Sequence, residues 1–320
     1  MRKTINKTHI EGKLYDFSLA EKTVQNEKSK NFGKAFINGT IDIATDDDNM
    51  NIVTVHYSYE PVNTNSGKPN SKYTALKNII ENGKTVLNHG AENATLLKID
   101  SALGLNDFYT NRNGEEVLVA AKRNESGFIT VVSKLCDAAK RSTFETDMLI
   151  NGTRVVEADE EKNISEDYMI IKGAVFDFKG SILPVEFAVR NKGGIKYFES
   201  LDISASNPVF TKVWGQIVSQ SIPDVRTEES AWGEPIVKEY TKNFREWLVI
   251  GTSKPDATYE IGDEKNGITA DEIKKALADR EVHLAEVKKS QEEYQASKAN
   301  KTDELPFSDT GSAKAGSFNF

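Results

Sequence analysis

The sequence is poor in cysteine and histidine, with one cysteine, Cys136, and four histidines among its 320 residues. A single thiol excludes an internal disulfide and a zinc site built from several cysteines. The histidines are scattered along the chain, and none has metal-ligand spacing from another. We therefore predict no metal site and no cofactor, and we interpret Cys136 as a buried structural residue.

Long hydrophobic runs are also missing. The longest, such as Leu248–Ile250, cover only a few residues, whereas a membrane-spanning helix needs about 20. Residues 1–4 lead straight into charged and polar residues, without the apolar segment of a signal peptide. With 38% hydrophobic and 28% charged residues, the composition is typical of a soluble globular protein. We expect a cytoplasmic protein with no membrane partner.

The short motifs of the common enzyme classes do not occur in the sequence. It contains no G-x-x-x-x-G-K-[ST] phosphate loop, no G-x-G-x-x-G, no H-E-x-x-H and no G-x-S-x-G. The run of three aspartates at 46–48 lacks the glycine and the glutamate of a calcium-binding loop. We therefore expect a protein that is not an enzyme.

Acidic residues outnumber basic ones by 49 to 41, which gives a net charge of −8. The excess lies in the second half, because residues 1–145 carry 19 basic and 18 acidic side chains whereas residues 146–320 carry 22 and 31. This balance argues against a uniformly basic nucleic-acid coat, but it allows one basic groove on an acidic molecule.

Alternating apolar and polar residues predict strands in the first half of the chain. They lie at 9–17, 36–43 and 52–59, and a segment with helical spacing follows at 73–80. Two more strands are predicted at 116–121 and 128–135. Three strands, a helix and two strands match the order of the five-stranded oligonucleotide-binding barrel, the OB-fold, although other small barrels share it.

The second half also reads as mainly β. Strands are predicted at 147–158, 168–177, 183–190, 195–203, 209–219 and 247–251. Gly193-Gly194 predicts a hairpin turn between two of them. The pattern I-x-G-x-[LV]-[YF]-D-F occurs at 10–17 and again at 171–178, an offset that would suit the length of one domain. We therefore predict two related OB-like β-barrel domains, at 1–143 and 144–262.

The segment 263–296 is predicted to hold an amphipathic helix over 268–296, which starts with a capping box, Thr269 with Glu272. Its apolar stripe consists of Ile273, Leu277, Leu284, Val287 and Tyr294. The stripe would either dock on the second barrel or pair with another subunit, so a homo-oligomer is one open alternative. Residues 297–320 are rich in Ser, Ala, Gly, Lys and Asp, and we predict a disordered tail.

Aromatic and basic residues are interleaved on the predicted strands. Such residues can hold a single-stranded nucleic acid, because bases stack on flat side chains while lysine and arginine contact the phosphates along the strand. In the first barrel we predict a groove lined by Lys13, Tyr15, Lys34, Tyr57 and Tyr59. In the second we predict one lined by Lys179, Arg190, Lys196, Tyr197, Lys212 and Trp214. Aromatic residues in strands also build cores, so core packing is the alternative for each of these rings.

Within the tail, Asp303, Glu304, Leu305, Pro306 and Phe307 place two acidic residues before an apolar residue, proline and phenylalanine. This segment resembles the tail tip of bacterial single-stranded DNA-binding proteins. The resemblance implies docking of replication or recombination proteins, with the carboxylates on a basic rim and the phenylalanine in an apolar slot. The sequence departs from that family because the chain continues past Phe307 and the tail has as many basic as acidic residues.

The order of barrels, helix and tail resembles the single-stranded DNA-binding proteins of tailed bacteriophages, especially over 171–178, 209–219 and the tail tip. That resemblance implies a non-catalytic protein that coats and protects single-stranded DNA in phage DNA replication and recombination, in the host cytoplasm. The alternative is a virion structural or assembly protein, because two β-domains, an exposed helix and a flexible tail would suit subunit contacts equally well.

Overall fold

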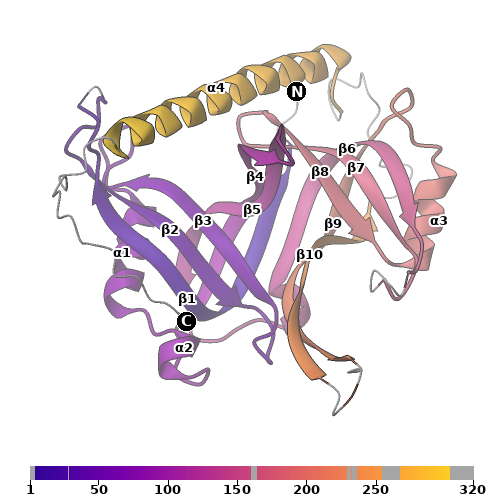
Figure 1. Ribbon diagram of the computed structural model, residues 1–320, viewed down its shortest axis with the longest axis horizontal. Helices are drawn as coiled ribbons and strands as arrows, with labels where there is room; N and C mark the ends of the chain where they lie inside the picture. Colours follow the sequence, from indigo (N-terminus) through magenta and orange to yellow (C-terminus); the bar gives the residue numbers. More distant parts are fainter. Residues whose placement is uncertain are drawn as a thin grey trace, which may run out of the picture.

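The structure, a computed structural model, describes residues 4–27, 29–159, 164–228, 232, 236–253 and 267–302. Figure 1 shows two β-barrels side by side, with a long helix running across both. Among the described residues, no helix is both long and apolar enough to cross a membrane.

The first barrel is a closed sheet of five strands. Its elements are β1 (Asn6–Thr23), β2 (Ala35–Ala44), β3 (Ile52–Pro61), α1 (Ser71–Asn82), α2 (Val86–His89), β4 (Leu96–Arg112) and β5 (Glu115–Val131). The strands pair in the order β1-β2-β3-β5-β4-β1, antiparallel throughout except for the parallel pair β3–β5. With α1 between the third and fourth strands, this is the topology of an OB-fold.

The second barrel repeats that topology. Its elements are β6 (Ser142–Val156), β7 (Tyr168–Phe176), β8 (Ile182–Val189), α3 (Lys192–Ser200), β9 (Val209–Glu228) and β10 (Ile236–Thr252). They close in the order β6-β7-β8-β10-β9-β6, again with one parallel pair, β8–β10. The prediction of a mainly β protein with two OB-like barrels is confirmed.

The barrels are joined edge to edge. The start of β1, Asn6–Ile10, pairs antiparallel with the start of β6, Ser142–Thr146. Asn51 adds a second link, because its side chain accepts a hydrogen bond from the Ser219 N–H at 2.6 Å and donates one to the Ile217 carbonyl at 3.2 Å. One cluster of buried hydrophobic residues runs through both barrels, so they form a single packed body.

In the first barrel the strand predictions after α1 were wrong in detail. Strand β4 was not predicted, and β5 is one strand that covers 116–121 and reaches Val131. The alternation breaks inside β5 because the β4–β5 register shifts there, at a β-bulge where Ser126 has a φ of +21°. The sequence pattern read this bulge as a gap between two strands.

In the second barrel the strand predicted at 195–203 is wrong, because helix α3 occupies most of it. The Asn191 side chain caps this helix by accepting hydrogen bonds from the N–H groups of Gly193 and Gly194 at 2.8 and 3.1 Å. The two glycines therefore form the first turn of a helix and not a hairpin. Ile195 and Phe198, at helical spacing, then pack against the core.

The repeated pattern at 10–17 and 171–178 does not mark equivalent positions. The first copy lies on β1, the first strand of its barrel, and the second mainly on β7, the second strand of the other. Both copies need glycine for the same reason: a Cβ on Gly12 would lie 2.1 Å from the Ala44 carbonyl oxygen, and one on Gly173 would lie 2.0 Å from that of Leu149. The two-barrel prediction was right although this argument for it was not.

Helix α4 (Ala270–Thr302) docks on both barrels. The predicted capping box is present, since the Thr269 hydroxyl accepts from the Glu272 N–H at 3.2 Å and the Glu272 carboxylate accepts from the Thr269 N–H at 3.0 Å. Ile273 and Ala276 pack beside Phe210 of the second barrel. The helix begins at Ala270, directly after the predicted capping residue Thr269, and its end at Thr302 makes part of the predicted tail helical.

The middle of α4 is fixed to strand β4 of the first barrel. Arg280 makes two hydrogen bonds to Asp107, at 2.8 and 2.6 Å. Gln291 bonds both backbone groups of Tyr109, accepting from its N–H at 2.9 Å and donating to its carbonyl at 2.5 Å. The predicted apolar stripe is therefore only part of the docking face, and its member Leu277 is 49% exposed.

Candidate nucleic-acid interface

A cleft of about 510 Å³ opens on the surface of the first barrel, between the β1–β2 loop and the β3–α1 loop. The β1–β2 loop contributes Lys30 and Lys34 to its wall, and the end of β3 contributes Tyr59 and Pro61. Two residues of the predicted first groove, Lys34 and Tyr59, are thus brought together although the whole of β2 separates them in the sequence.

One aromatic residue, Tyr59, lines this cleft. The Tyr59 ring is 40% exposed and lies 4.8 Å from the Phe36 ring, centroid to centroid, at an interplanar angle of 37°. Phe36 holds the Tyr59 ring from the neighbouring strand β2, so the tyrosine presents its other side to solvent. Phe32, on the β1–β2 loop, is 53% exposed. Flat rings of this kind are available for stacking.

The cleft is locally basic in an acidic protein. Segments 22–36 and 59–72, which contain its walls, hold six lysines and two glutamates. Lys30 and Lys34 are exposed, with the Lys34 Nζ 3.1 Å from the Asn31 Oδ1. One of the two glutamates, Glu60, is buried behind the cleft. An anion in the cleft would therefore meet ammonium groups on side chains that can move to contact it.

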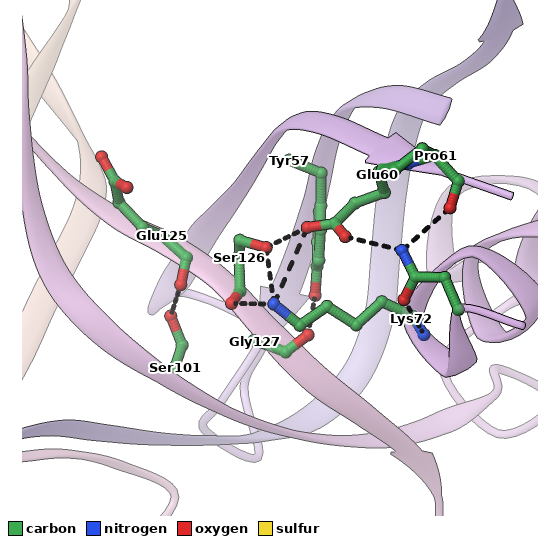
Figure 2. Close-up of polar contacts among 9 residues, drawn as sticks. Tyr57, Glu60, Pro61, Lys72, Ser101, Glu125, Ser126 and Gly127 are labelled. Atoms are coloured by element: carbon green, nitrogen blue, oxygen red, sulfur yellow. Dashed lines mark hydrogen bonds and ion pairs between the residues drawn. The ribbon is translucent and has the colours of Figure 1, made fainter. Parts of the chain in front are cut away.

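A polar cluster anchors the strand end that carries Tyr59. Figure 2 shows the buried Glu60 carboxylate, which accepts a hydrogen bond from the Ser126 hydroxyl and lies 3.8 Å from the Lys72 Nζ. Asn70, the N-cap of α1, donates to Glu60 at 3.3 Å and to the Pro61 carbonyl at 2.9 Å. The cluster ties β3, α1 and the β5 bulge together, so the backbone on both sides of Glu60 is held in place for the cleft.

Tyr57 is not part of any surface. It is 1% exposed, its hydroxyl donates to the Gly127 carbonyl at 3.3 Å, and burial raises its pKa. The prediction that Tyr57 stacks with bases was wrong, because alternation along β3 points it into the barrel while Tyr59 lies past the point where the β2–β3 register shifts.

The other two residues of the predicted first groove lie on β1. Lys13 turns toward the 46–49 turn, with its Nζ 3.2 Å from the Asn49 Oδ1. Tyr15 is half-buried where the β1–β2 register shifts. Neither residue lines the cleft. Lys30, Phe32 and Phe36 were left out of the predicted groove, although the run of lysines at 22–34 pointed to this loop.

The predicted second groove does not form one surface. Arg190 is bound to Glu246 by two hydrogen bonds, at 3.0 and 2.6 Å, and lies 4.6 Å from the Tyr168 ring centroid. A phosphate would have to displace this carboxylate. Tyr197 is on helix α3, packs against the core and has a buried hydroxyl. These two residues are therefore structural.

The remaining members of that set come from three different elements. Lys179 lies in the β7–β8 turn and Lys196 on α3, and both are exposed. Lys212 and Trp214 share a face of β9, where the Lys212 Nζ is 2.8 Å from the Glu145 carboxylate. The Trp214 ring is 39% exposed, but it lies over Gly251, where an added Cβ would come within 2.5 Å of the indole.

A second cleft, of about 440 Å³, lies between β5 and strands β7 and β8. Its two lysines are both engaged by one residue: Lys122 donates to the Glu186 carbonyl at 2.5 Å, and the Lys172 Nζ is 3.2 Å from the Glu186 carboxylate. The lining residues include no exposed aromatic ring. The first cleft is therefore the better candidate for a nucleic acid.

The partner motif predicted at Asp303, Glu304, Leu305, Pro306 and Phe307 lies outside the described residues.

The chain matches a family model in sequence and is similar to solved structures. The model of the YorF family matches residues 4–290. No curated protein matches the chain in sequence. A solved structure, a deletion mutant of the single-stranded DNA binding protein from Thermus aquaticus, is similar with a TM-score of 0.45 and 9% identity, over 83% of this chain and 100% of that one. A likeness of this size does not establish a shared function.

Proposed function

The chain belongs to the YorF family, and we propose that it binds single-stranded DNA in the cleft of its first barrel without catalysing a reaction. One observation carries the proposal: an exposed Tyr59 ring, backed by Phe36, lies in a concave surface together with Lys30 and Lys34. The alternative interpretation, that the aromatic ring packs in the core, holds for Tyr57 and not for Tyr59.

The chemistry of the cleft suits a flexible single strand better than a duplex. A base that stacks on an aromatic side chain contributes about 1–3 kcal/mol, and it needs an exposed π-face that a paired strand does not offer. OB-folds bind oligonucleotides on the face of strands two and three and on the loop between strands one and two. Tyr59 on β3, Phe36 on β2 and Lys34 in the β1–β2 loop occupy these positions.

We extend the proposal to the role that the sequence resemblance implies. The protein coats and protects exposed single strands during phage DNA replication and recombination, in the host cytoplasm. Segment 303–307 recruits replication or recombination proteins. The support for this part is the resemblance of the domain order and of the tail motif, together with the cleft that gives the coating activity a site.

The test measures, by fluorescence anisotropy, the affinity for a labelled single strand of about 30 nucleotides and for the matching duplex at two salt concentrations. A strand of this length spans roughly two OB-fold binding sites. We expect preference for the single strand and an affinity that falls as salt rises. Lys34→Gln should lower the affinity and flatten the salt dependence, whereas Lys196→Gln, an exposed lysine outside the cleft, should not.

No binding at low salt would overturn the proposal. If the protein then formed stoichiometric higher oligomers without DNA, a virion structural or assembly protein would be the function to pursue. Equal loss of affinity in Lys34→Gln and Lys196→Gln would keep DNA binding but reject the cleft as its site.

A further inference from the structure

Three side chains with metal-ligating atoms meet beside the segment that connects the barrels. His9 and Glu11 are next-but-one neighbours on β1, so both point to the same face of the strand. Cys136 lies between β5 and β6, so the whole first barrel separates it from β1 in the sequence. A ring nitrogen of His9, a carboxylate oxygen of Glu11 and the Cys136 sulfur all lie within 4.8 Å of one another.

His9 lies between two carboxylates. Its Nε2 is 3.3 Å from the Glu11 Oε2, and its Nδ1 is 3.0 Å from the Asp100 Oδ1. A neutral imidazole carries one N–H, so one of its nitrogens directs a lone pair at a carboxylate unless a second proton or a cation lies there. A metal ion at Nε2 removes this conflict, because the other nitrogen then donates to Asp100, the arrangement that orients metal-bound histidines.

The other two donors are held in place by the fold. Glu11 is 6% exposed, and its Oε1 accepts a hydrogen bond from the Cys136 N–H at 2.5 Å. Arg141 donates from Nε to the Cys136 carbonyl at 2.6 Å, which fixes the backbone on the other side of the same residue. Cys136 and His9 are half-buried, so the cluster remains reachable from solvent.

We propose that His9, Glu11 and Cys136 bind a divalent transition-metal ion of the Zn²⁺ class, with Asp100 orienting the histidine. Nitrogen, oxygen and sulfur donors together suit zinc, and a water molecule completes four-coordination. Donors around a tetrahedral zinc lie about 3.5 Å apart. His9 Nε2 and Glu11 Oε2 are already 3.3 Å apart, so only separations to the Cys136 sulfur need to shorten on binding. The ion ties the connecting segment to β1.

This site departs from the expectation of a protein without metal. That expectation rested on the lack of histidines and cysteines at short spacings, whereas here the fold brings together residues from β1 and from the far end of the first barrel. The proposal is independent of DNA binding, because none of the three residues lines the cleft that holds Tyr59.

The single cysteine gives a direct test. The reduced, chelator-treated full-length protein is titrated with Zn²⁺ against a chromophoric competitor, and the reaction of Cys136 with a thiol reagent is followed. We expect one equivalent of zinc to bind and to slow the thiol reaction at least tenfold. Co²⁺ in its place should give a sulfur-to-cobalt charge-transfer band that Cys136→Ser abolishes.

His9→Gln should lose the protection by zinc, while His89→Gln, an exposed histidine on α2, should keep it. Circular dichroism checks that both variants fold. If stoichiometric zinc leaves the wild-type thiol reaction unchanged, or if folded His9→Gln is protected as well as the wild type, the proposal is wrong. Should His9→Gln not fold, the wild-type thiol and cobalt measurements decide alone.

Discussion

The attachment of α4 to the first barrel depends on a buried ion pair, and its removal should release the helix. The Arg280 and Asp107 side chains are 9% and 3% exposed, and two hydrogen bonds of 2.8 and 2.6 Å join them. Removing one partner of a buried pair costs about 3–5 kcal/mol, because the other charge stays buried. At about 1.4 kcal/mol for each factor of ten, Arg280→Met should make undocking of α4 roughly a hundred to a few thousand times more frequent.

Hydrogen exchange measured by mass spectrometry reports this undocking. We expect exchange in peptides from α4 to accelerate at least a hundredfold in Arg280→Met, while peptides from β1 and β6 keep their protection. Lys275→Met is the control, because Lys275 and Asp279 are 82% and 62% exposed and 3.8 Å apart, a pair worth less than about 0.5 kcal/mol. Asp107→Leu combined with Arg280→Met should restore much of the protection, since no charge stays buried. An effect of Arg280→Met no larger than the control's would refute the reasoning.

Three further outcomes follow from single contacts. The Tyr73 hydroxyl donates to Glu21 at 2.5 Å, which raises the pKa of Tyr73 to about 12. The free energy of unfolding should therefore fall as pH rises from about 10, where an unfolded tyrosine ionises, to 12. In urea melts Tyr73→Phe should show a smaller loss than the wild type, and the part that remains comes from other tyrosines with a raised pKa, such as Tyr57. Tyr57→Phe should lower the free energy of unfolding in the same melts by about 1 kcal/mol. It should leave the affinity for single-stranded DNA unchanged, and a large drop in affinity would mean that Tyr57 belongs to the binding site. Asn191→Ala should lower the free energy of unfolding by about 1 kcal/mol because α3 loses its N-cap, whereas Asn191→Asp should lower it little. Equal losses in the two variants would show that the Asn191 side chain does not stabilise α3 as a cap.

The fold class could be predicted because strand alternation is local. Ile10 and Leu14 on β1, and Val53 and Val55 on β3, are all buried, as their period-two spacing indicates. What failed was context that alternation does not encode. The break in β5 near Ser126 is a bulge set by its pairing with β4. Gly193-Gly194 opens a helix because the Asn191 side chain caps it, a local signal that the turn-forming pair of glycines concealed.

The candidate site was predicted only in part, for the same reason. Tyr57 and Tyr59 are both aromatic residues of one strand, and only the register shift in β2–β3 separates the core residue from the exposed one. The basic loop correctly indicated Lys34 as a residue of the binding site. Arg190 looked equally suitable in the sequence, which does not show that Glu246 lies beside it and binds it. Pairing across long sequence separations is the information that the pattern lacks.

The most direct test of the account compares two aromatic residues in the same anisotropy assay. Tyr59 lies in the cleft, and Phe178 is 90% exposed with the Lys179 Nζ 5.4 Å from its ring centroid, the same chemistry outside the two clefts described above. Tyr59→Ala should weaken binding of the single strand by about 1–3 kcal/mol, roughly 5- to 150-fold, and Phe178→Ala should leave it within twofold of the wild type. Unchanged affinity in Tyr59→Ala, or equal losses in both variants, would contradict the claim that single-stranded DNA binds in the cleft of the first barrel.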